Sequence, residues 1–189
     1  MIPRYNAISR ILSIIPTDEV LITTTGMISR EVFDIHDRPN NFYMLGSMGL
    51  LSSFGLGLAL KFPTKKIWIL EGDGSALMSL GTIPLIASEG PENLVHFILD
   101  NESYESTGGQ PSISSNVSLE EIARSSGYPS VNKVTNIESL ELAISEIGSS
   151  MGPILNLVKC GTGPVAGIPR VTLTPEEIRN RFKSALTNQ

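Results

Sequence analysis

Two short polar motifs carry the residues whose types and spacing suit metal chemistry. Gly72-Asp73-Gly74-Ser75 follows one apolar run and Asp100-Asn101 follows the next, with room between them for about one helix. Mg²⁺ takes oxygen ligands and commonly combines one or two protein side chains with phosphate oxygens. A glycine-flanked turn lets the backbone approach phosphate groups, and a following helix offers them unpaired N–H groups. The motifs therefore predict a divalent cation that holds a diphosphate.

The elements that must position these motifs alternate between short β-rich runs and helical patterns. Such alternation is typical of a parallel sheet with helices on both faces. We predict a three-layer α/β fold with a mainly parallel six-stranded sheet, built as a single domain over residues 1–189. The predicted strands are 20–24, 41–44, 66–70, 94–99, 131–134 and 153–158, and the predicted helices are 8–15, 26–36, 50–61, 76–88, 119–125, 137–147 and one that starts at 174.

Glycine-containing turns follow three of the predicted strands, at 25–26, 46–49 and 72–74. Ligands of open α/β sheets bind outside the carboxyl ends of the strands, so these turns and Asn101 are expected at one edge. The pattern indicates a phosphate-bearing cofactor. It does not fit a nicotinamide fingerprint, because the glycines at 55 and 57 lie inside an apolar helical pattern, and no P-loop sequence occurs.

Composition excludes several classes of function. The formal net charge of −5 argues against nucleic acid or an anionic membrane surface as a partner. The longest apolar stretch, around 50–60, is interrupted by serines and glycines and is too short to span a bilayer. The single cysteine, Cys160, excludes a disulfide framework within the chain and is predicted to be structural. We therefore expect a cytoplasmic protein.

The two motifs resemble the thiamine diphosphate motif, in which a Gly-Asp-Gly turn is followed by a pair of asparagines. Nearly the whole chain resembles phosphonopyruvate decarboxylases and the β subunits of sulfopyruvate decarboxylases. The segments that carry this resemblance are TTGMISRE at 24–31, MLGSMG at 44–49 and LDNESYESTGGQP at 99–111. One departure is Asp100, which stands where the family has the first asparagine and adds a negative charge near the expected metal.

The resemblance implies a role for each matched residue. Asp73, Asn101 and the carbonyl group of Ser103 would bind Mg²⁺. The Ser- and Gly-rich segment 102–115 is expected to be a functional loop, and its residues 104–111 would line part of the substrate pocket, with Glu105 the candidate for proton transfer. The remaining cofactor-binding residues would be Gly26, Ser29, Gly46, Ser47, Met48, Gly72, Gly74, Ser75 and Tyr104, with Met48 supporting the bent cofactor.

The resemblance also implies a partner. Thiamine enzymes need a glutamate beside the pyrimidine ring, and the family places it on a separate pyrimidine-binding domain. The chain would then be the β subunit of a hetero-oligomeric decarboxylase whose α subunit completes the site. Its substrate would be a small anionic 2-oxoacid, sulfopyruvate or phosphonopyruvate, and the products would be CO₂ and the corresponding aldehyde. The length of 189 residues favours the sulfopyruvate type.

Two other functions stay open at this point. One is the thiamine-binding subunit of a 2-oxoacid oxidoreductase, against which the single cysteine argues. The other is a non-catalytic cofactor-binding module. Three further residues need an interpretation. His96 is predicted to be a core histidine with satisfied hydrogen bonds, and Arg170 is a candidate contact for a sulfonate or phosphonate. Arg30 could pair with Glu31 or Asp34 or reach a substrate anion, and we favour the salt bridge.

Overall fold

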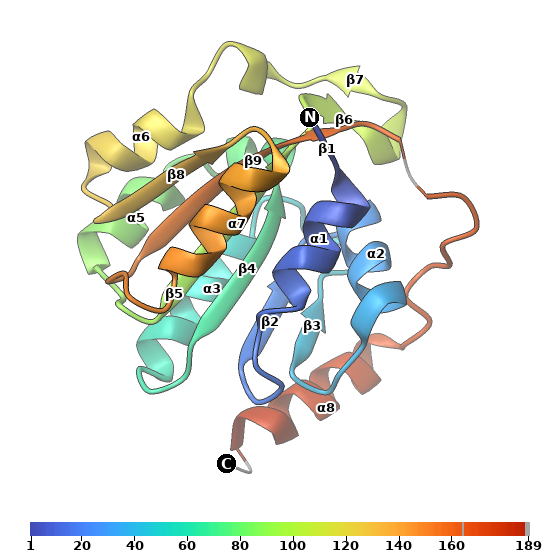
Figure 1. The fold of residues 1–189 in the computed structure, drawn as a ribbon. Helices are drawn as coiled ribbons and strands as arrows, with labels where there is room; N and C mark the ends of the chain where they lie inside the picture. Colours follow the sequence, from blue (N-terminus) through green and yellow to red (C-terminus); the bar gives the residue numbers. More distant parts are fainter. Residues whose placement is uncertain (164, 188–189) are drawn as a thin grey trace.

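The computed structural model describes residues 1–163 and 165–187 of the chain. Its main sheet has seven strands and carries helices on both faces (Figure 1). This arrangement confirms the predicted three-layer α/β fold. Six strands lie where they are predicted: β2 (Val20–Thr23), β3 (Asn41–Tyr43), β4 (Ile67–Gly72), β5 (Leu94–Asp100), β8 (Ser130–Val134) and β9 (Ile154–Gly161).

The predicted count of six strands is wrong by one. The additional strand is β1 (Ile2–Pro3), which pairs in parallel with Cys160 and Gly161 at the end of β9. β8 pairs only with residues 154–158 of β9 and leaves the last part of that edge free for β1. A strand of two residues, one of them a proline, has no alternating pattern, so no periodic signal marks it in the sequence.

The order of the strands reverses between β2 and β4. β2 pairs with both β3 and β4, and β4 continues through β5 to β9, with every pairing parallel. The chain thus runs outwards from β2 to β3 and returns to β4 on the other side of β2. Doubly wound sheets bind ligands at such a reversal, beyond the carboxyl ends of the strands. The turns at 24–26 and 72–75 flank this position.

Two apolar clusters fix the helices to the faces of the sheet. One cluster joins α1, α2 and α7 to residues such as Trp68 and Leu70, and the other joins α3, α5 and α6 to the alternate residues Ile67 and Ile69. α1 and α7 lie in front of the sheet in Figure 1. The helices are α1 (Arg4–Leu12), α2 (Met27–His36), α3 (Leu51–Lys61), α4 (Asp73–Met78), α5 (Thr82–Glu89), α6 (Leu119–Ser126), α7 (Ile137–Glu146) and α8 (Pro175–Thr187).

The helix predicted over 76–88 is two helices, α4 and α5. The break lies at 79–81, where the Ser79 hydroxyl donates to the carbonyl group of Gly49 and the backbone N–H of Thr82 bonds back to Ser79. The apolar residues on both sides of the break pack into one cluster, so the helical periodicity continues through it. α4 itself begins directly at Asp73, at the end of β4.

The segment predicted as a functional loop folds into a small antiparallel hairpin. β6 (Ser103–Tyr104) pairs with β7 (Gln110–Pro111), and a short 3₁₀ helix (Glu105–Thr107) lies between them. The hairpin lies over the carboxyl ends of the strands (Figure 1). It is the element that brings polar side chains from the 104–111 loop to the end of β4.

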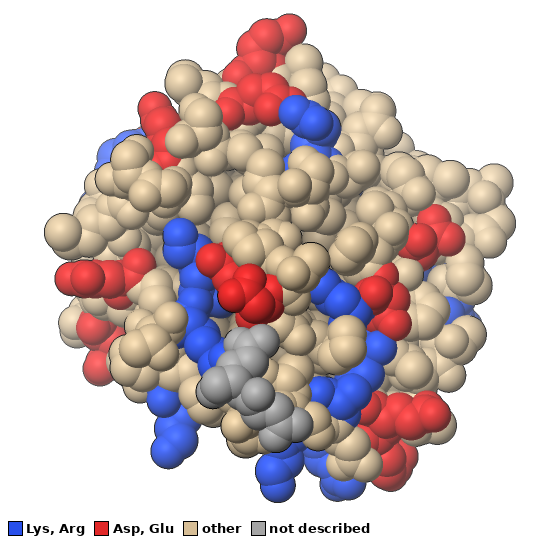
Figure 2. All heavy atoms as spheres, turned by 60° about the horizontal axis from the view of Figure 1, so that its bottom comes forward, with Lys and Arg blue, Asp and Glu red and all other residues tan. Residues whose placement is uncertain are grey.

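The helices of the described residues and one face of the surface bear on membrane and polyanion binding. Within residues 1–163 and 165–187, no helix is both long enough and apolar enough to cross a membrane. On the face that carries the C-terminal helix, basic and acidic side chains are interspersed (Figure 2). This mixture lacks the single-sign field that favours binding to a polyanion.

Candidate active site

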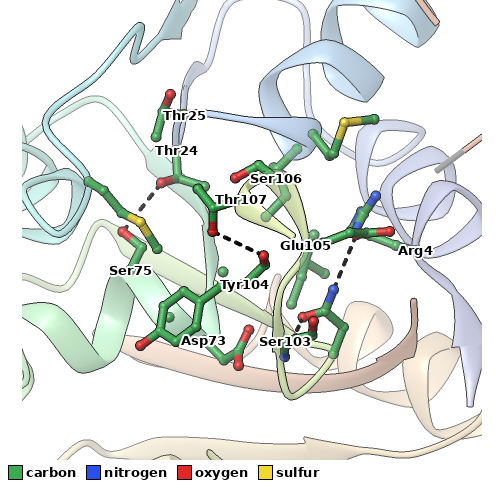
Figure 3. A pocket seen from close by; sticks show the side chains of 17 residues that line it. Arg4, Thr24, Thr25, Asp73, Ser75, Ser103, Tyr104, Glu105, Ser106 and Thr107 are labelled. Carbon is green, nitrogen blue, oxygen red and sulfur yellow. Dashed lines mark hydrogen bonds and ion pairs between the residues drawn. The ribbon is translucent and has the colours of Figure 1, made fainter. Parts of the chain in front are cut away.

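Residues from five separate segments meet at the carboxyl edge of the sheet. They line a small pocket of about 80 Å³, which we call the Asp73 pocket. Thr24 and Ser75 lie across it from Arg4 and Glu105 (Figure 3). Pockets for drug-sized ligands span roughly 300–1,000 Å³, so this volume suits a metal ion and phosphate groups rather than a whole coenzyme. Of the predicted site residues, those that line it are Met48, Gly72, Asp73, Gly74, Ser75, Asn101, Ser103, Tyr104 and Glu105.

Two positions at this edge require glycine, one for its backbone conformation and one for a close side-chain contact. Gly26, at the start of α2, has φ 90° and ψ −140°, a conformation that other residues rarely adopt. Gly74 lies against the ring of Tyr104, and a Cβ atom at position 74 would lie 2.4 Å from Cε1 of that ring. Tyr104 can therefore cover the start of α4 only because residue 74 has no side chain.

The Asp73 carboxylate is buried beside a second carboxylate. It is 2% exposed, and its Oδ2 accepts hydrogen bonds from the hydroxyls of Ser112 and Ser114, the second at 3.0 Å. The Ser114 hydroxyl also lies 2.8 Å from Oδ1 of Asp100, but its one proton can serve only one carboxylate at a time. Burial, together with the nearby charge of Asp100, raises the pKa of Asp73. A cation beside Asp73 would relieve this unfavourable charge.

Lys159 compensates the charge of Asp100, the residue that departs from the family pattern. Its Nζ lies 2.7 Å from Oδ2 of Asp100 and also contacts Glu102. Burial alone would lower the pKa of Lys159, but its hydrogen bonds to the two carboxylates raise it. This ion pair with Lys159 of β9 therefore neutralises the extra negative charge of Asp100. Asp73, by contrast, forms no ion pair with any described residue.

Asn101 is held in one orientation by two hydrogen bonds. Its Oδ1 accepts from the backbone N–H of Ser103 at 3.1 Å, and its Nδ2 donates to Oε2 of Glu105 at 3.2 Å. An amide oxygen has two lone pairs, so Oδ1 keeps one for a metal ion. The Asn101 amide is therefore fixed in place with an oxygen lone pair unused.

A buried ion-pair network closes the pocket on the side of α1. Arg4 is 4% exposed and binds Glu31 through two parallel hydrogen bonds of 2.9 and 2.8 Å. Its Nη1 also contacts Glu105. Burial opposes the charge on Arg4, but hydrogen bonds to both carboxylates raise its pKa, so the guanidinium stays charged. The prediction that Arg30 pairs with Glu31 or Asp34 is wrong: Arg4 binds both carboxylate oxygens of Glu31, and Arg30 forms no ion pair with either residue.

Glu105 is fully engaged by its neighbours. Besides Arg4 and Asn101, it accepts a hydrogen bond of 2.6 Å from the backbone N–H of Gly163. A carboxylate with three such donors is suited to anchoring the hairpin and orienting Asn101. Its predicted role in proton transfer stays a prediction, which these contacts do not favour.

The hydroxyl of Ser75 is also engaged, by a buried polar chain behind the pocket. It donates to Oε1 of Glu71 at 2.7 Å and accepts from the backbone N–H of Gly49 at 3.0 Å. The other Glu71 oxygen lies 3.1 Å from Nε2 of His96, and both of these side chains are fully buried. The prediction of a satisfied core histidine holds for Nε2 of His96, while its Nδ1 has no partner among the described residues.

Four of the predicted cofactor-binding residues lie outside the Asp73 pocket. Ser29 is buried, and its hydroxyl donates to the carbonyl group of Thr24 at 2.5 Å, so it stabilises the turn after β2. Gly26 and Ser29 line a neighbouring pocket. Gly46 and Ser47 line a groove beside α8 instead. The resemblance therefore placed these four residues at the correct edge of the sheet, but the structure does not place them in the Asp73 pocket.

Other residues at the site escaped the sequence analysis: Arg4 and Thr24 line the Asp73 pocket, and Ser112 and Ser114 contact Asp73 without lining it. Ser112 and Ser114 lie in the polar loop that was predicted to be functional, so their polarity was a signal that could have found them. Arg4 had no such signal, since its partner Glu105 is 101 residues away along the chain. Thr24, at the end of β2, lines the pocket as well, and its position after a strand could have identified it.

The donor set fits a metal ion that is shared with a diphosphate. Among the residues described, no group of three or more His, Cys, Asp or Glu side chains could hold a metal alone. The pocket instead offers the carboxylate of Asp73, the amide of Asn101 and the backbone near Ser103. Mg²⁺ commonly uses such a partial set and completes its shell with phosphate oxygens and water.

Comparison with known proteins identifies the class. Residues 22–156 match the family described as thiamine pyrophosphate enzyme, C-terminal TPP binding domain. The match covers most of the chain, which therefore belongs to this family. The fold agrees: benzoylformate decarboxylase from Polynucleobacter necessarius superimposes with a TM-score of 0.70 over 85% of this chain and 34% of its own, at 17% identity.

Two curated relatives show which members of this family the chain resembles. The chain is 38% identical to phosphonopyruvate decarboxylase from Streptomyces viridochromogenes over 97% of its length, but spans only 46% of that protein. It is 36% identical to sulfopyruvate decarboxylase subunit beta from Methanococcus maripaludis, with 97% of both chains covered. These relatives confirm the family resemblance that the sequence motifs predict.

Proposed function

We propose that this chain is the thiamine diphosphate-binding β subunit of a decarboxylase for sulfopyruvate or phosphonopyruvate. The products would be CO₂ and the corresponding aldehyde. The observation that supports this best is the Asp73 pocket, where a buried carboxylate and an oriented amide meet at the strand-order reversal. The names of the relatives support the choice of a decarboxylase over an oxidoreductase subunit or a non-catalytic module.

The metal of this site would be Mg²⁺, held by Asp73, Asn101 and the carbonyl group of Ser103. The raised pKa of Asp73 and its lack of an ion pair within the described residues support a cation at this position. When bound, thiamine diphosphate supplies the nucleophilic carbon and the electron sink that decarboxylation of a 2-oxoacid needs. Gly74 and Ser75 would contact the diphosphate through their backbone, because the Ser75 hydroxyl is engaged by Glu71.

A separate pyrimidine-domain α subunit would complete the site with the glutamate that thiamine activation needs. The coverage of the relatives supports this: the chain spans nearly all of a protein named as a β subunit but about half of a phosphonopyruvate decarboxylase. The assembly would then be a hetero-oligomer. The single domain over 1–189 and the cytoplasmic location stay predictions, the latter supported by a buried free cysteine, Cys160.

The test is reconstitution with the pyrimidine-domain partner. The complex, loaded with thiamine diphosphate and Mg²⁺, should release CO₂ and the aldehyde from sulfopyruvate or phosphonopyruvate, and the chain alone should be inactive. Calorimetry should detect binding of thiamine diphosphate with Mg²⁺ and much weaker binding with EDTA. Turnover by the isolated loaded chain would contradict the two-chain site, and coenzyme binding without turnover by the complex would favour a non-catalytic module.

A further inference from the structure

A second pocket lies directly beside the Asp73 pocket and carries two arginines. It has a volume of about 390 Å³ and is lined by Arg30 of α2 and by Arg170, which lies between β9 and α8. We call it the arginine pocket. Thr25 and Ser106 line both pockets, so the two spaces adjoin along these residues. The segment that carries Arg170 runs along the outside of α2 (Figure 1).

Unbalanced positive charge distinguishes this pocket from its neighbour. No Asp or Glu is among its lining residues, and neither arginine forms an ion pair with another described residue. Glu31, which follows Arg30 in α2, is used by Arg4, and Asp34 accepts from the hydroxyl of Tyr5. In the Asp73 pocket, by contrast, the one guanidinium is matched by two carboxylates.

We propose that Arg30 and Arg170 bind the second anionic group of the substrate, its sulfonate or phosphonate. This proposal rests on the proposed function and adds the residues that recognise the substrate class. A guanidinium presents several N–H donors in a planar fork that matches the oxygens of such groups, and it is always charged. The shared residues Thr25 and Ser106 would let one small molecule reach from the arginine pocket to the coenzyme site.

The decisive experiment compares substrates with and without the second anion. In the reconstituted complex, R30A and R170A should each raise KM for sulfopyruvate about ten- to hundredfold, the range expected for losing a hydrogen bond to a charged group. KM for pyruvate, which lacks that anion, and the affinity for thiamine diphosphate should stay unchanged. R30K should recover part of the loss, and R124A removes an exposed arginine of α6 as a matched charge control.

A binding readout keeps the test independent of turnover. Calorimetry of the loaded complex should detect 3-sulfopropanoate, which keeps both anions but has no ketone, and much weaker binding of propanoate. R30A should abolish this difference while its thermal melting stays like that of the wild type. If the complex turns over no 2-oxoacid, the proposed function fails, but the comparison of these two anions still decides whether the arginines form an anion site.

Two results would overturn the inference. If R30A and R170A weaken thiamine diphosphate binding as much as they raise KM, the arginines serve the diphosphate of the coenzyme. If R30A, R170A and R30K change KM for sulfopyruvate and for pyruvate equally, or change neither, the arginines do not recognise the second anion.

Discussion

Arg4 and Arg30 lie at the same edge of the sheet, in adjacent pockets, but have opposite surroundings. Arg4 is buried between Glu31 and Glu105, while Arg30 has no ion-pair partner among the described residues. A guanidinium held by two carboxylates has its charge compensated within the protein, and its loss would leave buried charge unpaired. A guanidinium without such partners contributes little to the fold and stays free for an anion. Identical side chains therefore have different roles because of their neighbours.

The largest effect should follow from R4M. This change removes the charge that compensates the buried Glu31 and the partly buried Glu105, and breaking a buried ion pair in this way costs about 3–5 kcal/mol in free energy of unfolding. Urea denaturation of the apoprotein measures it. R30M is the matched control and should stay within about 0.5 kcal/mol of the wild type. Equal losses for the two variants would remove the distinction between the arginines.

D73N should separate coenzyme binding from stability. Replacing the Asp73 carboxylate removes a proposed metal ligand, so the Mg²⁺-dependent affinity for thiamine diphosphate should fall at least about hundredfold. Mutating residues that only hydrogen-bond to metal ligands already lowers metal affinity about 10–100-fold. The apoprotein should melt at the same or a higher temperature, because the repulsion between Asp73 and Asp100 is gone. Calorimetry and thermal melts give both values, with D34N as an exposed control. Unchanged coenzyme binding by D73N would exclude Asp73 as the metal ligand.

The raised pKa of Asp73 also predicts a pH dependence. A carboxyl group whose pKa is higher in the folded than in the unfolded state stabilises the apoprotein at low pH and loses this contribution as pH rises through the folded pKa. Mg²⁺ needs the ionised form, so its affinity should fall about tenfold for each pH unit below that pKa. Calorimetry in buffers of different ionisation enthalpy should detect proton release on binding. In D73N this proton release should disappear, and its persistence would assign it to another group.

S114A should have the smallest effect. The Ser114 hydroxyl lies between Asp73 and Asp100, and its loss leaves one of these carboxylates short of a donor, at a cost of about 1 kcal/mol. The pKa of Asp73 should rise further, which shifts the pH dependence of Mg²⁺ binding upwards. S145A, on the exposed face of α7, is a suitable control. A pH profile identical to that of the wild type would mean that Ser114 does not tune Asp73.

The sequence predicted the elements whose burial pattern is periodic or continuous. β5 is buried along its whole length and was found as one apolar run, while β1 escaped because two residues carry no period. The helix predicted over 76–88 was too long because a helical apolar period runs on across the break at 79–81. The edge of the sheet where the site lies followed from the turns after the strands, since parallel strands end on one side.

Side-chain partners at the site were less predictable. Arg30 was expected to pair within its own helix, but Glu31 points to Arg4, which the sequence separates from it by 27 residues. Ser29 and Ser75 were expected at the diphosphate, but their hydroxyls bond to Thr24 and Glu71 and stabilise the turns after β2 and β4. Local spacing limits which pairs can form within an element, whereas pairing between elements depends on how the helices pack on the sheet.

By itself, the amino-acid sequence determined the α/β class, the family and the edge that carries Asp73 and Asn101. These depend on local periodicity and on short motifs, which the chain order preserves. Only the tertiary structure decided that Arg4 is neutralised and Arg30 is not, that Lys159 compensates Asp100, and that two pockets adjoin at Thr25 and Ser106. The physical reason is that charge compensation acts over a few ångströms in space, between residues that can be a hundred positions apart in the chain.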